Sequence, residues 1–95
     1  MPLTLLDQSE LLQLIRSRSR VGAEVLYDQY AKVLSLAIFH IVKQNVLTNM
    51  VLEKAICQIW DTADQYNEQE LPFLPWMLGI ARTLAKENIA SMKLE

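Results

Sequence analysis

Glycine, proline and cysteine are scarce in this sequence, and each shortage excludes a class of fold or site. Two glycines and three prolines in 95 residues are too few for a turn-rich β fold or a Pro- and Gly-rich disordered chain. The single cysteine, Cys57, excludes an internal disulfide and a zinc site built on cysteines, and it fits a reducing cytosol. His40 is the single histidine and has no second metal ligand in view. We therefore expect no metal site and no cofactor.

Signatures of enzymes and of membrane segments are also missing. The sequence has no G-x-x-x-x-G-K loop, no H-E-x-x-H motif and no paired Ser, His and Asp arrangement. No stretch reaches the ~18 uninterrupted apolar residues of a spanning helix, and the first residues lack the basic start and long apolar run of a signal peptide. The sequence therefore predicts a non-enzymatic cytoplasmic protein that does not contact a membrane.

Positive charge is in short supply, which limits what the chain can do with nucleic acid. The formal net charge is −2, so contact with DNA would have to come from a local basic patch. We interpret the short cluster Arg16, Arg18 and Arg20 mainly as a solvated helix end, with DNA or an acidic partner as the alternative. An acidic patch, better matched to a protein partner, is formed by Asp61, Asp64, Glu68 and Glu70.

What the sequence has in abundance is apolar residues at helical spacing. Steps of three and four predict helices at about 9–18, 23–44, 49–64 and 73–92, with a principal loop over 65–72. Ser9 and either Thr48 or Asn49 are expected as N-caps, and Gly22 is expected to allow the chain to change direction between the first two helices. The sequence thus predicts an all-α fold, with residues 1–95 forming one compact bundle of about four helices.

The same periodicity predicts a single shared core. Aromatic residues on these faces, including Trp60 and Trp76, are more readily explained by packing than by stacking on bases. The ten residues expected in the core are Leu26, Tyr30, Leu34, Ile38, Leu52, Ile56, Ile59, Trp60, Trp76 and Ile80.

Three phrases of the sequence, in order, resemble one protein family. Residues 23–34, AEVLYDQYAKVL, resemble L-Y-x-x-Y-A-x-x-L; residues 59–66, IWDTADQY, are similar to A-W-x-x-A-x-x-F; residues 73–85, FLPWMLGIARTLA, are similar to F-x-x-W-L-x-x-I-A-R-N-x-A. These phrases belong to region two of bacterial sigma factors of the extracytoplasmic-function type. The resemblance covers roughly residues 9–93. In the family a second helical domain, region four, follows region two. All three phrases match region two, and none of them matches region four.

The resemblance implies a transcription initiation domain with two binding surfaces. It implies that residues 49–58 face a coiled coil of the largest subunit of the RNA polymerase core, through Asn49, Glu53, Lys54 and Gln58. It also implies recognition of the minus-ten promoter element as a melted single strand, which needs a loop pocket with basic and aromatic groups nearby. The residues expected at the DNA are Tyr66, Asn67, Arg82, Lys86 and Lys93.

Both implied surfaces depart from the family pattern. The family's polymerase-facing D-x-x-Q-E-x-F corresponds to Met50, Glu53, Lys54 and Ile56, so an acid of the family is replaced by lysine at position 54. The family's basic D-x-x-R-R-like ending is replaced by residues 87–93, ENIASMK. DNA binding by the isolated domain is therefore expected to be weak. The alternative is a degenerate sigma-like helical module that binds only protein, such as an anti-sigma factor or a second copy of itself.

Overall fold

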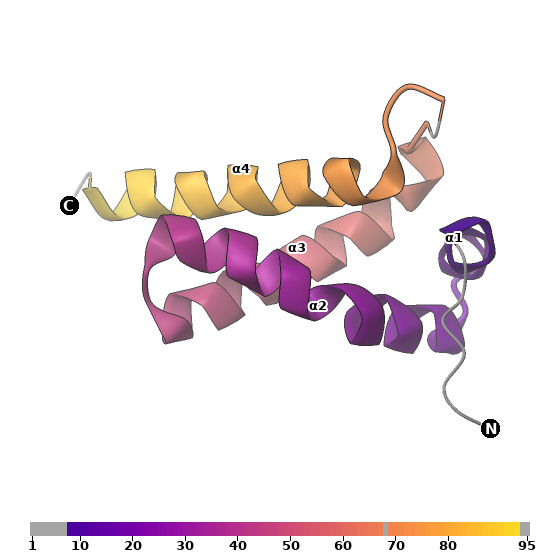
Figure 1. Cartoon of the computed structure of the whole chain (residues 1–95), viewed down its shortest axis with the longest axis horizontal. Helices are drawn as coiled ribbons and strands as arrows, with labels where there is room; N and C mark the ends of the chain where they lie inside the picture. Colours follow the sequence, from indigo (N-terminus) through magenta and orange to yellow (C-terminus); the bar gives the residue numbers. More distant parts are fainter. Residues whose placement is uncertain (1–7, 68, 94–95) are drawn as a thin grey trace.

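Four α-helices make up the described part of this protein (Figure 1). The computed structural model describes residues 8–67 and 69–93, and within these residues it contains no β-strand. The helices are α1 (Gln8–Arg16), α2 (Arg20–Val42), α3 (Asn45–Thr62) and α4 (Phe73–Lys93), and a short 3₁₀ helix, η1 (Ala63–Gln65), directly continues α3. The predicted all-α bundle of about four helices is confirmed.

Three long helices form the body of the molecule, and the short first helix closes one end of it. Helices α2, α3 and α4 all pack on one another, whereas α1 packs on α2 and on η1. Figure 1 shows α2 and α3 as a hairpin with α4 running along it, and α1 lying across the end where α2 begins. The loop that joins η1 to α4 lies at the same end. This end therefore gathers segments that are distant in the sequence.

Helices α2 and α3 begin earlier than the apolar pattern indicated. Helix α2 begins at Arg20 rather than at 23, and α3 begins at Asn45 rather than at 49. Gln44 is the N-cap residue of α3, so neither Thr48 nor Asn49 caps it. Thr48 instead lies buried in the first turn, where its Oγ1 donates a hydrogen bond to the carbonyl of Gln44 at 2.7 Å. Ser9 similarly lies within α1, which begins at Gln8.

The chain changes direction between α1 and α2 at Arg18 and not at Gly22. The amides of Arg18 and Ser19 donate to the carbonyls of Ile15 and Leu14, at 3.0 and 2.9 Å, which is the hydrogen-bond pattern of a Schellman motif. Arg18 has φ 62°, the left-handed conformation in which this motif usually places glycine. Gly22 lies inside α2 without a positive φ, so it does not make the turn.

The core draws side chains from all four helices. Of the ten residues predicted for it, the buried ones are Leu26, Leu34, Ile38, Leu52 and Ile59. The other five pack against the core and stay partly exposed: Tyr30, Ile56, Trp60, Trp76 and Ile80. The periodicity underestimated α1, whose apolar side chains Leu11, Leu12 and Ile15 are almost completely buried.

Helix α2 is the most apolar of the described helices. By length and composition alone, Arg20–Val42 could cross a membrane. In the structure it contacts α1, α3 and α4 and is the central helix of a compact globule. The central position accounts for part of its apolar composition, whereas Val21, Tyr27, Leu36 and Phe39 remain exposed.

Candidate functional site

The outer side of α3 displays the residues that the sequence associated with polymerase binding. Asn49, Glu53, Lys54 and Gln58 are all exposed. The opposite side of the helix is buried through Val51, Leu52, Ala55 and Ile59. Asn49 and Glu53 are one helical turn apart, as are Lys54 and Gln58, and the second pair is turned by about 140° around the helix from the first. The four residues therefore spread over the whole solvent-exposed half of α3, which we call the α3 face.

A shallow depression lies within the α3 face. Glu53, Lys54 and Gln58 line it together with Cys57, Asp61 and Thr62. Cys57 is exposed. Acidic, basic and amide side chains thus surround one hollow, a composition suited to polar contacts with a protein partner.

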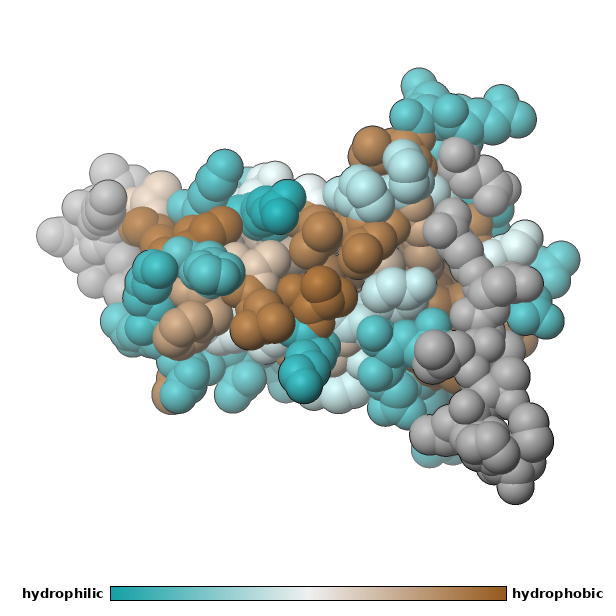
Figure 2. All heavy atoms as spheres, viewed as in Figure 1, coloured by the Kyte–Doolittle hydropathy of each residue, from teal (hydrophilic) through white to brown (hydrophobic). Residues whose placement is uncertain are grey.

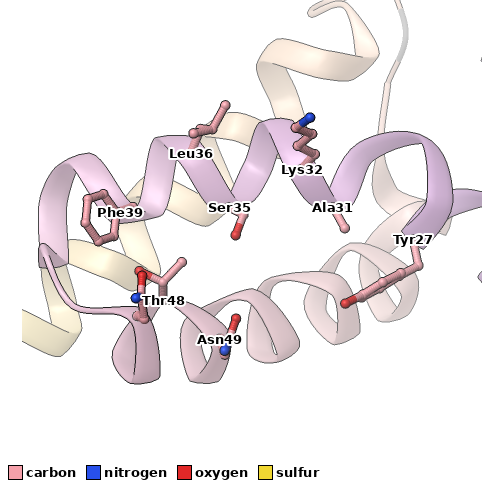
Figure 3. Close-up of a pocket in the computed structure, with 9 residues that line it drawn as sticks. Tyr27, Ala31, Lys32, Ser35, Leu36, Phe39, Thr48 and Asn49 are labelled. Atoms are coloured by element: carbon pink, nitrogen blue, oxygen red, sulfur yellow. The ribbon is translucent and has the colours of Figure 1, made fainter.

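A groove separates α2 from the first half of α3 and continues the α3 face through Asn49 (Figure 3). In Figure 3, Ser35 of α2 and Asn49 of α3 extend into the gap from opposite sides. Phe39 lies at one end of the groove and Tyr27 at the other. Tyr27 is 52% exposed and Phe39 is 39% exposed. The groove therefore has a polar middle and aromatic ends that solvent reaches.

Tyr66, which was expected in the loop as a stacking residue for a base, is part of the core. Its side chain is 5% exposed, and its hydroxyl donates a hydrogen bond to the carbonyl of Leu71 at 2.6 Å. Its ring centroid lies 4.6 Å from that of Trp76 and 5.5 Å from that of Phe73. The loop folds back over the aromatic start of α4, so the Tyr66 ring is not accessible to a base in this conformation.

The remaining residues predicted at the DNA are exposed but do not converge. Asn67 lies in the loop, where its Oδ1 accepts a hydrogen bond from the amide of Gln69 at 2.9 Å. Arg82 and Lys86 are exposed one turn apart on α4, and Arg82 lies about 14 Å of helix beyond the start of α4, the end at which the loop joins. Lys93 ends α4, and its side chain lies outside the described residues. The structure therefore provides one exposed basic pair rather than a joined pocket and basic patch.

Two of the three N-terminal arginines donate hydrogen bonds to the C-terminal end of α3 and to η1. Arg16 donates from Nε to the carbonyl of Ala63 at 3.1 Å and from Nη2 to that of Tyr66 at 2.7 Å. Arg18 donates to the carbonyl of Trp60 and reaches the Asp64 carboxylate at 3.4 Å. We call these contacts the arginine clamp. Helix ends leave carbonyls without partners and carry partial negative charge, which explains why guanidinium groups bind there.

The interpretation of the arginines as a solvated end is therefore wrong for Arg16, whose guanidinium binds two carbonyls. It holds in part for Arg18, which binds the end of α3 but stays exposed. The interpretation holds for Arg20, whose side chain is 93% exposed and whose ion pair with the Glu24 carboxylate is long at 4.0 Å. Periodicity along the chain carries no signal for the clamp, because its partners, three backbone carbonyls and the Asp64 carboxylate, lie 42 to 50 residues away in the sequence.

The acidic patch is partly neutralised by this clamp. Asp61, Asp64 and Glu70 are exposed, and Glu68 lies outside the described residues. The carboxylate of Asp64 is paired with Arg18. Asp61 remains on the rim of the α3 face, where it adds negative charge to the surface presented to a partner.

Comparison with known proteins returned no relative of this chain. No protein-family model, no curated protein and no solved structure matches it. Among the described residues, no group of three or more histidine, cysteine, aspartate or glutamate side chains is placed to hold a metal ion. The functional argument therefore depends on the described surfaces and on the three sequence phrases.

Proposed function

We propose that this chain is a cytoplasmic sigma-like helical domain that docks on the RNA polymerase core through the α3 face. The contact would be made by Asn49, Glu53, Lys54 and Gln58 with the coiled coil of the largest polymerase subunit. The observation that carries the proposal is the joint exposure of these four residues on a helix whose other side is held in the core. A rigid helix with polar outward side chains suits docking on a helix pair, because little ordering is needed when it binds.

Promoter DNA is the weaker part of this proposal. The exposed basic groups of α4 are Arg82 and Lys86, with the acidic Glu87 beside them. Few phosphates can be neutralised by so few charges, so the domain would contact the minus-ten strand only as an addition to polymerase binding.

A second candidate function is a module that binds only protein, such as an anti-sigma factor. Two observations favour it over a domain that reads DNA. The ring of Tyr66 is buried, and the guanidinium groups of Arg16 and Arg18 are bound to the end of α3 and η1. Tyr66 was among the residues expected at the DNA, and the arginine cluster was the alternative basic patch.

The charge at position 54 tests the polymerase contact. Lys54→Glu restores the acid that the resembled family carries there, and Lys54 is exposed. We expect pull-down with purified polymerase core to retain more of the variant, by about fivefold, the effect of ~1 kcal/mol at an exposed charged contact. Lys86→Glu is the matched control, because it makes the same charge change at an exposed lysine of α4.

The two variants must differ for the proposal to stand. Equal retention of both would mean that net charge acts rather than the α3 face. If Lys54→Glu lowers retention, or if neither the variant nor the parent binds polymerase, docking through the α3 face is wrong. Binding to an anti-sigma factor with no binding to polymerase would support the second candidate.

A further inference from the structure

Most of the large exposed apolar side chains lie on two neighbouring helices. Among the described residues, seven large hydrophobic side chains are substantially exposed, and six of them lie on α2 or on the first half of α3. They are Val21, Tyr27, Leu36, Phe39, Val46 and Met50. Figure 2 shows hydrophobic atoms gathered across the middle of the face over α2 and towards α4. Contiguous exposed apolar surface of this kind often marks a site of contact with another molecule.

The exposed side of α2 also has a pattern that reads the same in both directions. Val21, Asp28, Lys32 and Phe39 follow one another at steps of seven, four and seven residues, so they lie along one line of the helix surface. Read from the other end, the order is again an apolar residue, a charge, the opposite charge and an apolar residue. Two copies of α2 in antiparallel orientation would therefore place complementary residues opposite each other.

The two charges at the centre of this line are available for a partner. Asp28 and Lys32 are exposed and one helical turn apart. Within the described part of the chain, neither forms an ion pair. An ion pair across an interface fixes register and orientation, because a shifted or parallel arrangement would bring like charges together or leave them unpaired.

We propose that two copies of this chain pair through the exposed side of α2, in antiparallel orientation. Asp28 lies opposite the partner's Lys32, and Val21 lies opposite the partner's Phe39. Both contacts occur twice, as the two-fold symmetry of a dimer requires. Val46 and Met50, at the edge of the same surface, border the apolar ends of the contact.

The available surface has the size expected of a weak pair. Helix α2 has 23 residues and is about 35 Å long, and the first half of α3 lies beside about 14 Å of that length. At a width of about 10 Å per helix, the strip covers roughly 500 Å². This area is smaller than the ~800 Å² that each partner contributes to a standard interface.

This pairing has a consequence for the α3 face. Asn49 lines the groove between α2 and α3, between the ends marked by Tyr27 and Phe39. A second copy seated on α2 covers this part of the α3 face, so the pair and a polymerase-bound copy exclude each other. This consequence rests on the proposed function, whereas the pairing itself does not.

Charge reversal in separate copies is the decisive experiment. Asp28→Lys places Lys at 28 and 32, and Lys32→Asp places Asp at both positions, so each variant repels itself and is expected to be monomeric. An equimolar mixture brings the two lysines of one copy opposite the two aspartates of the other and is expected to pair. Sedimentation equilibrium over a concentration series measures the molecular mass in solution. We expect a mass near 10.9 kDa for each variant alone and twice that value for the parent and for the mixture.

Two exposed leucines supply a matched control. Leu36→Glu adds a charge on the proposed interface, and Leu71→Glu makes the same change on the loop before α4, away from it. We expect the first variant to be monomeric and the second to pair as the parent does. A parent that stays monomeric up to its solubility limit overturns the proposal, as does a mixture of the charge-reversed copies that stays monomeric. Because polymerase is absent from these measurements, their outcome is independent of the proposed function.

Discussion

At the scale of single residues, the two glycines lie in helices but in opposite surroundings. A Cβ on Gly22 would lie 2.8 Å from the Cβ of Leu14 and 2.9 Å from its backbone carbonyl carbon. A Cβ on Gly79 would have no neighbour within 4 Å. The absence of a side chain at Gly22 therefore allows α1 and α2 to approach closely, whereas Gly79 only weakens α4.

Alanine at these two positions is expected to act with opposite sign. Gly79→Ala should raise the free energy of unfolding by about 0.5–1 kcal/mol, because alanine restricts the unfolded chain and favours the helix. Gly22→Ala should lower it by ~1–3 kcal/mol, because the backbone of α1 has to move away. Urea denaturation of both variants measures the difference. A stabilised Gly22→Ala would show that α1 does not pack here.

At the scale of elements, the position of α1 depends on two kinds of contact. Its apolar side packs into the core, and the arginine clamp joins its C-terminal end to α3 and η1. Arg18 occupies a left-handed position where glycine is less strained, and its guanidinium lies 5.6 Å from the centre of the Trp60 ring. The clamp explains why an arginine stands at a position that favours glycine.

Removing the clamp residue Arg16 should loosen α1 selectively. Arg16→Ala loses two hydrogen bonds from a charged group to the carbonyls of Ala63 and Tyr66. We expect the free energy of unfolding to fall by about 2 kcal/mol and amide hydrogen exchange to quicken in α1 more than in α4. Arg20→Ala is the control, because this exposed side chain should contribute less than about 0.5 kcal/mol. Equal effects of both variants would contradict the clamp.

At the scale of the whole molecule, charge limits what the isolated domain can bind. The net charge is −2, and exposed basic groups on α4 are few. Each phosphate that the domain neutralises on a single strand adds a slope of only ~0.7 in log affinity against log salt. A surface of this kind suits association with protein better than association with DNA.

We therefore expect no detectable duplex binding and at most weak single-strand binding by this chain at physiological salt. Arg82→Glu should reduce the single-strand signal, and Glu87→Lys should increase it, as measured by anisotropy at two salt concentrations. Tyr66→Ala, by contrast, should act through stability, because the ring is packed on Phe73 and Trp76. Tight binding that Arg82→Glu leaves unchanged would place the DNA surface elsewhere.

The helices and their inward sides follow from the sequence. Apolar residues at steps of three and four predicted α2, α3 and α4, and Leu26, Leu34, Ile38 and Ile59 are buried as expected. These features are local, because each depends on residues within one or two helical turns. Asn49, Glu53, Lys54 and Gln58 were chosen by the resemblance rather than by periodicity, and all four are exposed.

Tertiary structure alone decided what the polar and aromatic residues near the helix ends do. Tyr66 was expected at the surface because it follows α3 in a polar stretch, yet the loop returns over Phe73 and Trp76 and buries it. Arg16 was expected in solvent, yet its partners are carbonyls brought to it by the packing of α1 across η1. The physical reason is the same in both cases: the partner is remote in sequence, and no periodicity along the chain encodes which remote atoms will satisfy a hydrogen bond or cover a ring.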